Sequence, residues 1–89
     1  MPSDSIIILN YNMRELTLNC LAAFAPALHH RGWQIIVVDN GSSDGSAEAL
    51  HDQFPFAEII RSEHNLGFAG GANLGVRNSS GHPASPGAA

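Results

Sequence analysis

A short apolar run that stops at an acidic, glycine-containing loop constrains the fold of this chain more than any other feature. Residues 35–38 read Ile-Ile-Val-Val, and residues 39–44 read Asp-Asn-Gly-Ser-Ser-Asp. A continuous apolar run bounded by turn-forming residues is typical of a strand buried on both faces, as in parallel sheets. Asp39 would then lie at the carboxyl end of the strand, where open α/β sheets bind ligands. The run therefore predicts a fold and a ligand site together.

Helical patterns alternate with this strand and two others. Strands are expected over residues 5–9, 35–38 and 57–61, and helices over residues 12–25, 45–53 and 68–78. The third strand is expected to be less buried than the second. The order β-α-β-α-β-α predicts an α/β fold, a three-layer parallel sheet with right-handed crossovers. Residues 1–81 would form this part of a domain, and the proline-containing tail over residues 82–89 is expected to be disordered.

The first helix is predicted from its capping and its apolar spacing. Asn12 and Glu15 have capping-box spacing, with Asn12 as the N-cap. Apolar residues recurring every four positions predict the buried face, with two alanines widening it: Leu16, Cys20, Phe24 and Leu28, with Ala23 and Ala27. Cys20 is thus expected to be a small core residue. Pro26 should kink or end the helix near Ala25, and residues 29–32 should form the connection to the next strand.

The second helix has a simpler signature. Asp44 is a candidate N-cap, and Pro55 is expected to close the segment. Ala47, Leu50 and Phe54 would form the apolar face.

Composition excludes several classes of function. The 89 residues, of which 44% are hydrophobic and 13% charged, fit one small α/β domain or part of one. The net charge is −4, no lysine is present and the four arginines are scattered, so binding to nucleic acid through a cationic surface is not expected. The single cysteine cannot form an intramolecular disulfide. No apolar stretch is long enough to span a membrane and no basic signal-peptide region is present, so a cytoplasmic protein is expected.

The loops that follow the three strands should gather at one edge of the sheet. In the first loop, Tyr11 lies between Asn10 and Asn12. The aromatic ring could stack on a nucleobase while the amides read its polar edge. The alternative is a helix cap beside a half-buried tyrosine.

The second loop carries Asp39, Asn40 and Gly41. Asp39 could accept hydrogen bonds from a base imide or a ribose hydroxyl, as acidic residues do at strand ends in dinucleotide folds. In the alternative reading, Asn40 and Gly41 supply a tight turn and Asp44 caps a helix. For Asp44 the structural role is preferred.

The third loop leads into a helix with four glycines, at positions 67, 70, 71 and 75. Glycine costs about 1 kcal/mol relative to alanine inside a helix, so this composition indicates close backbone approach, either to a neighbouring helix or to a phosphate. The spacing differs from the dinucleotide fingerprint, and there is no Walker lysine. His64 is read as a loop histidine, and the histidines show no helical metal-binding pair.

Taken together, residues 6–12, 35–46 and 65–75 resemble the N-terminal part of family 2 glycosyltransferases, which have the GT-A fold. The resemblance is closest to the bacterial rhamnosyltransferase-like group. It implies that the loop 10–12 and the acid at Asp39 hold the base and ribose of a nucleotide-sugar, and that Asn65, Gly67, Asn73 and Gly75 pack beneath the nucleotide. The nucleotide-binding residues expected from motif and resemblance are Asn10, Tyr11, Asn12, Asp39, Asn40, Gly41, Asn65, Gly67 and Asn73.

Two departures from the family pattern stand out. Ala72 occupies a position at which many relatives carry a basic residue. The Asp-x-Asp strand that binds metal in the family would follow Gly81, with the catalytic base further on, and no acidic residue follows Glu63. Transfer needs a cation on the leaving pyrophosphate and a base for the acceptor hydroxyl. This chain is therefore expected to be a fragment that holds no cofactor and does not transfer sugar by itself, whereas a full-length relative would use Mg²⁺ or Mn²⁺.

These observations favour a fragment that binds the nucleotide of a UDP-, dTDP- or GDP-sugar. The full-length parent, in the cytoplasm or at the inner face of the membrane, would transfer a sugar to a cell-surface glycan or glycolipid. One alternative is a non-catalytic α/β nucleotide-binding or regulatory module, and another is a domain whose glycines serve packing only. By the resemblance, the first strand would lie at an open edge of the sheet, so self-association is also expected.

Overall fold

In the computed structural model, which describes residues 4–79, three strands and three helices alternate along the chain. They are β1 (Ser5–Asn10), α1 (Arg14–His30), β2 (Gln34–Asn40), α2 (Ser46–Gln53), β3 (Glu58–Ser62) and α3 (Gly67–Arg77). The predicted element order is confirmed. The expectation of disorder over residues 82–89 lies outside the described residues.

All three strands are parallel and their order in the sheet is β1-β2-β3. The central strand β2 is buried from Ile35 to Asn40, while β3 is only partly buried, as predicted. β1 lies at one edge. The architecture is α/β, a partial Rossmann-like parallel sheet, as the resemblance to the GT-A fold implied.

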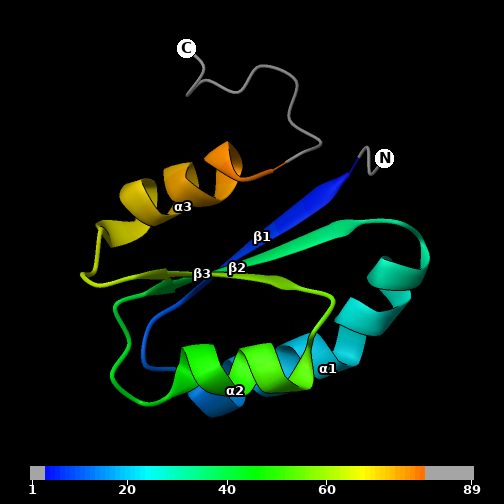
Figure 1. Cartoon of the computed structure of the whole chain (residues 1–89), viewed down its shortest axis with the longest axis horizontal. Coiled ribbons are helices and arrows are strands. Elements are labelled where there is room, and N and C mark those ends of the chain that lie inside the picture. The colour runs from blue at the N-terminus through cyan, green and yellow to red at the C-terminus, as the bar shows by residue number, and fades with distance from the viewer. Residues whose placement is uncertain (1–3, 80–89) are drawn as a thin grey trace.

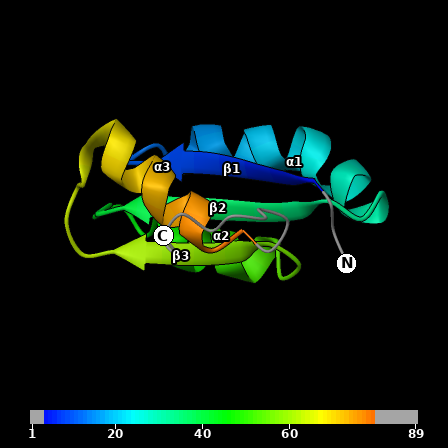
Figure 2. The same ribbon diagram turned by 90° about the horizontal axis from the view of Figure 1, so that it is seen from above.

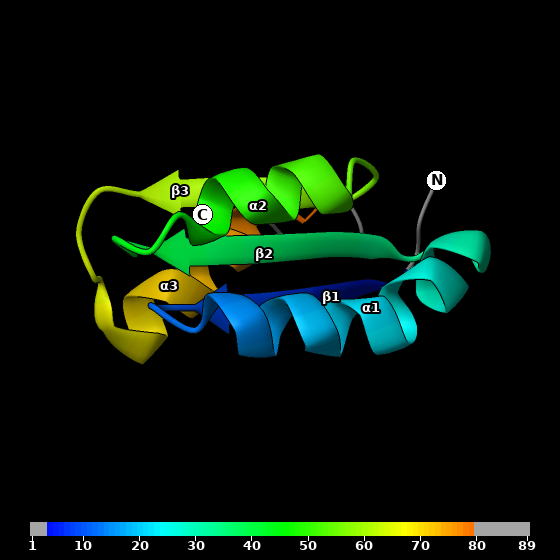
Figure 3. The ribbon, with the colours of Figure 1, turned by 90° about the horizontal axis from the view of Figure 1, so that it is seen from below.

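Helices cover both faces of this sheet, which gives three layers. Figure 1 shows α3 on one face and α1 and α2 on the other. From above, α3 crosses over β1 and β2, and from below α1 and α2 lie side by side (Figures 2 and 3). The main core fills the space between the sheet and the α1–α2 layer. Its buried residues are Leu18, Leu21, Ala25, Ile35, Val37, Leu50, Phe54 and Ala57.

β1 and β2 extend beyond the apolar runs from which they were predicted and include polar residues at their carboxyl ends. β1 includes Asn10, and β2 includes both Asp39 and Asn40. Neighbouring strands extend them, because Asp39 lies opposite Arg61 and Asn40 opposite Ser62 in the parallel register. Pairing of the backbone across strands is not visible in the hydropathy of one segment.

The predicted buried face of α1 is wrong. Leu16 is 65% exposed and Cys20 is exposed, whereas Thr17, Leu18, Leu21 and Ala25 are buried. Both stripes have helical spacing and both converge on Phe24 and Leu28, which are half-buried. The sheet selects the stripe that faces it, so Cys20 is a surface residue.

The predicted limits of α1 are also wrong. Its N-cap is Met13, with no side-chain cap, and Asn12 lies before it with a left-handed φ of 49°. The helix continues through Pro26 to His30, so both histidines assigned to the connection are helical. Pro26 leaves the carbonyl of Ala22 without its helical donor. Both residues are exposed, so water can hydrate that carbonyl.

Asp44 joins the beginnings of two helices. Its Oδ2 accepts from the backbone N–H of Arg14 in the first turn of α1 (3.1 Å), and its Oδ1 accepts from the N–H of Ser46 in α2 (3.0 Å). The N-cap of α2 is Gly45 (φ 80°) rather than the predicted Asp44. Asp44 therefore bonds to the helix from the position just before the N-cap. Ala47 and Leu50 of α2, and Phe54 directly after it, are buried as predicted.

The glycines of α3 allow it to lie directly on the strands. A Cβ on Gly71 would lie 2.9 Å from Leu9 Cδ2, and a Cβ on Gly75 would overlap Ile7 Cγ2 and lie 3.3 Å from Val38 Cγ2. Close approach was predicted, but the surface approached consists of strand side chains rather than another helix. None of the helices in residues 4–79 has the length and apolar character needed to cross a membrane.

Replacing Gly75 with alanine is expected to destabilise the fold. The substitution gains about 1 kcal/mol of helix propensity. Overpacking against Ile7 costs roughly 1–3 kcal/mol, so the net free energy of unfolding should fall. Urea denaturation of Gly75→Ala, Ile7→Ala and the double variant would test this. Since Ile7→Ala creates room for the new methyl group, the two losses should be less than additive. Additive losses would show that the helix and strand do not touch here.

Asp44 is expected to contribute to the stability of the fold against acid. The hydrogen bond from the Ser46 side chain, together with those from the backbone of Arg14 and Ser46, lowers the pKa of Asp44 below its ordinary 3.8, although desolvation opposes them. A lowered folded-state pKa stabilises the fold above pH 3.8, and this contribution disappears as pH falls through the folded-state value. Circular dichroism during acid titration should show a flatter acid limb for Asp44→Asn than for the wild type. Superimposable curves would contradict the double-cap role.

Candidate functional site

The three loops that follow the strands meet at the carboxyl edge of the sheet. They lie together at the left of Figures 1 and 3, where β1 leads to α1, β2 to α2 and β3 to α3. Parallel strands place all their carboxyl ends on one side, as predicted from the sequence. The polar residues singled out in three separate segments are thereby brought to one edge.

Asn10 and Asp39 form the buried centre of this edge. They are partners in the β1–β2 register, and each is 1% exposed. Asn10 Nδ2 donates to Asp39 Oδ1 (2.9 Å) and to Ser42 Oγ (3.1 Å), while Asn10 Oδ1 accepts from Thr17 Oγ1 (2.6 Å). All the amide's polar atoms are therefore engaged, and Asn10 orients Asp39.

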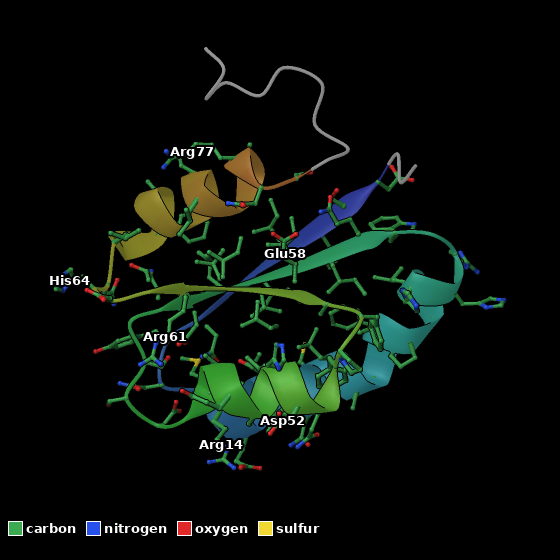
Figure 4. All side chains as sticks on the ribbon, viewed as in Figure 1. Arg14, Asp52, Glu58, Arg61, His64 and Arg77 are labelled. Atoms are coloured by element: carbon green, nitrogen blue, oxygen red, sulfur yellow. The ribbon has the colours of Figure 1, made fainter. Side chains whose placement is uncertain are left out.

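The second carboxylate oxygen of Asp39 has no partner. Oδ2 is buried and accepts no hydrogen bond in the structure. Arg61 lies opposite Asp39 in the register, but its Nη1 donates to Glu48 Oε2 on α2 (3.1 Å). Figure 4 shows Arg61 directed from β3 toward that helix. A buried carboxylate oxygen without a donor is costly, so this atom is a natural acceptor for a ligand N–H or O–H.

Reciprocal hydrogen bonds join the first loop to the second. The backbone N–H of Asn12 donates to Ser42 Oγ (2.8 Å), and Asn12 Oδ1 accepts from the backbone N–H of Ser43 (2.8 Å). This use of the Asn12 side chain replaces the predicted capping box. The two loops consequently form one rigid unit.

Asn40 joins the second loop to the third. Its Oδ1 accepts from the N–H of Leu66 (2.8 Å), and its Nδ2 donates to the carbonyl of Gly67 (3.1 Å). Gly41 has φ 87°, and a Cβ there would lie 2.9 Å from Asn65 N. Glycine is required at position 41 by both its conformation and its neighbour.

The remaining predicted residues differ in exposure. Tyr11 is 47% exposed beside the buried centre, and Asn12, Asn65 and Gly67 are exposed on the loops. Asn73 is exposed on α3, two residues from each of the buried Gly71 and Gly75, and therefore faces away from the sheet. The structure brings the loop residues together and leaves Asn73 apart.

Sequence reasoning missed Ser42 and Thr17. Ser42 accepts from both Asn10 and Asn12, and Thr17 donates to Asn10. Thr17 is 6% exposed, and a polar residue beside the apolar Leu18 gave no signal of burial. Ser42 could have been found from its place in the loop directly after Gly41.

The charged groups described around the edge form no metal cluster, and their charges balance in the pocket beside α2. Within residues 4–79, no three His, Cys, Asp or Glu side chains could hold a metal ion together. His64 lies at the outer tip of the loop after β3, and Arg77 lies on the far side of α3 (Figure 4). An open pocket of about 470 Å³ lies beside α2, but its charged lining residues balance: Arg14 and Arg61 against Glu48 and Asp52. This pocket offers no net positive charge for a diphosphate, and Asp39 does not line it.

Comparisons with known proteins agree with the fold and the motifs. The profile of glycosyl transferase family 2 matches residues 5–82. The chain is 35% identical over 86 residues to glycosyltransferase AglE of Haloferax volcanii, covering 91% of this chain and 28% of that protein. It is also 35% identical over 80 residues to the uncharacterized glycosyltransferase YfnE of Bacillus subtilis, covering 86% of this chain and 20% of that protein.

The matched segment contains β1 through α3 and all three loops of the candidate site. The chain spans about a quarter of the length of the curated relatives it matches. Because the family profile covers most of its residues, this chain belongs to glycosyl transferase family 2.

Proposed function

We propose that this chain binds the nucleotide part of a nucleotide-diphospho-sugar, as the donor-binding portion of a family 2 glycosyltransferase. The observation that carries the proposal is the unpartnered Oδ2 of Asp39, buried at the carboxyl end of β2. Ligands of open α/β sheets bind at this end of the strands. The family membership supports a donor of this class.

Asp39 would recognise the base through its free oxygen. Asn10 occupies Oδ1, which leaves Oδ2 to accept from a ligand. The imide N–H of uracil or thymine and the ring N–H of guanine are suitable donors, whereas N3 of cytosine is an acceptor. A UDP-, dTDP- or GDP-sugar would therefore be favoured over a cytidine nucleotide. A ribose hydroxyl is the other candidate donor.

Tyr11 would supply the stacking surface for the base. Its ring is about half exposed next to Asn10, which is itself fully engaged with protein partners. Aromatic side chains stack on any nucleobase, with roughly 1–3 kcal/mol per base. Recognition would then be divided between the face of the base at Tyr11 and its edge at Asp39.

The transfer step itself is proposed only for the longer parent protein. The described residues do not form a metal site, so we assign Mg²⁺ or Mn²⁺ to the parent and route no step through it here. The rhamnosyltransferase-like grouping, a cell-surface glycan or glycolipid acceptor, and a location in the cytoplasm or at the inner membrane face are parts of the same proposal. A non-catalytic nucleotide-binding module would use the same residues at the carboxyl edge of the sheet.

Asp39→Asn is expected to change base preference without loss of stability. Removing the charged acceptor should weaken UDP binding about ten- to a hundredfold, as expected for a hydrogen bond to a charged group. The new amide can keep its oxygen toward Asn10 and present an N–H to the ligand, which suits cytosine N3. Calorimetric titration with UDP and CDP should therefore show a reduced or inverted preference for UDP.

Asp4→Asn is the matched control, since it makes the same chemical change at an exposed residue before β1. Chemical unfolding of Asp39→Asn should occur at an equal or higher urea concentration than the wild type, because the free protein no longer buries an unpaired charge. If a folded wild type binds none of UDP, dTDP and GDP, the proposed function fails. Equal loss of UDP and CDP affinity would instead assign Asp39 to the ribose.

We also propose that the open edge of β1 mediates self-association. Residues 5–10 contain no charged side chain, whereas β3 carries the exposed Glu58 and Arg61. Charged residues protect edge strands from pairing, so β1 is the unprotected edge. In a solution of this chain alone, the partner available to it is a second copy.

Sedimentation velocity over a range of concentrations would test this proposal. The sedimentation coefficient should rise with protein concentration as β1 edges pair. A monomer at all concentrations that also unfolds cooperatively at high temperature in calorimetry would refute it.

A further inference from the structure

Asn40 uses both of its polar atoms to hold the loop before α3. Its Oδ1 accepts from Leu66 N–H at 2.8 Å, its Nδ2 donates to the Gly67 carbonyl at 3.1 Å, and the residue is 5% exposed. Asn40 also faces the opposite side of the sheet from Asp39, because successive strand residues alternate. Its side chain therefore has neither a free polar atom nor the direction needed to touch a nucleotide held by Asp39.

The loop depends on these two hydrogen bonds. In the part of the chain that the structure describes, the other hydrogen bonds of residues 63–67 outside α3 are local. Ser62 Oγ pairs with His64, and Asn65 Oδ1 accepts from Gly67 N–H. Gly41 adds a close contact rather than a bond, since a Cβ there would lie 2.9 Å from Asn65 N and from the His64 carbonyl carbon.

The held segment carries part of the candidate site. Asn65 and Gly67 are exposed within this segment. One turn further along α3, Gly71 packs against Asn40: a Cβ on Gly71 would lie 3.1 Å from Asn40 Nδ2. Asn40 follows Asp39 directly in β2, so the backbone that places the carboxylate also sets the position of this loop. Asp39 and the loop before α3 are thus fixed relative to each other through one side chain.

We propose that Asn40 is a positioning residue for donor binding, which fixes the Asn65–Gly67 segment relative to Asp39 without contacting the nucleotide. This inference rests on the proposed function. A loop that is correctly placed only part of the time lowers apparent affinity by that fraction. Asn40, which the sequence predicted to bind the nucleotide, would instead order the loop that carries Asn65 and Gly67.

Amide hydrogen exchange and UDP titration of the full 89-residue chain test the assignment. The variant is Asn40→Ala. The matched control is Asn78→Ala, which removes an amide-to-carbonyl hydrogen bond (Asn78 Nδ2 to Leu74 O, 2.8 Å) at the other end of α3. Asn40→Ala should lose exchange protection at the Leu66 amide and weaken UDP binding about tenfold, as for a loop in place a tenth of the time. Asn78→Ala should leave both unchanged.

Each other result overturns the assignment. Loss of Leu66 protection with unchanged UDP affinity would show that the hydrogen bonds of Asn40 to the loop do not affect binding. Weaker binding with Leu66 still protected would mean that Asn40 touches the ligand. If the wild type binds no nucleotide, the proposed function itself fails. Should Asn40→Ala not fold, Asn40→Leu has a similar shape and lacks both the acceptor for Leu66 and the donor to Gly67, so it carries the same comparison.

Discussion

The hydrogen bonds made by the end of β2 hold the rest of the site together. Asp39 is tied to β1 through Asn10, Ser42 to the first loop through Asn12, and Asn40 to the third loop through Leu66 and Gly67. Buried amides and hydroxyls need partners, and here the partners come from three segments distant in sequence. One strand end thereby fixes the geometry of all three loops. Among the described residues of this network, Asp39 Oδ2 accepts no hydrogen bond, and this unpaired oxygen is the basis of the proposed nucleotide contact.

Asp39 and Asn40 are adjacent in β2 but face opposite sides of the sheet. Asp39 faces the α1–α2 layer with the core residues Ile35 and Val37, while Asn40 faces α3, where Gly71 lets the helix approach its amide. Because side chains alternate along a strand, neighbouring residues of similar chemistry serve different faces. The acid keeps one oxygen without a protein partner, whereas the amide bonds to Leu66 and Gly67 at the start of α3. Motif spacing alone placed both among the ligand contacts.

Several expectations about α1 failed because contacts with other parts of the chain overrode local sequence patterns. α1 contains two apolar stripes that share Phe24 and Leu28, and only the sheet determines that Leu18 and Leu21 rather than Leu16 and Cys20 are buried. Asn12 has capping-box spacing, but its side chain bonds to Ser43 in another loop. Pro26 was expected to kink or end its helix, but the helix does not end there: it continues to His30, and Leu28 beyond the proline packs against the core. In each case a long-range contact outweighs a local preference, which is about 1 kcal/mol for a helix cap and about 3 kcal/mol for a proline inside a helix.

The sequence by itself determined the fold class, the order of the elements and the edge at which the polar loops gather. Apolar runs and turn residues are local features, and parallel strands necessarily bring their carboxyl ends together. Tertiary structure decided which residues at that edge are free. Asn10 and Asn40 have polar side chains in candidate positions, but each polar side-chain atom of both makes a hydrogen bond within the protein, whereas Asp39 keeps one oxygen unpaired. Whether a donor or acceptor is satisfied depends on partners about thirty residues away, and no local pattern encodes them.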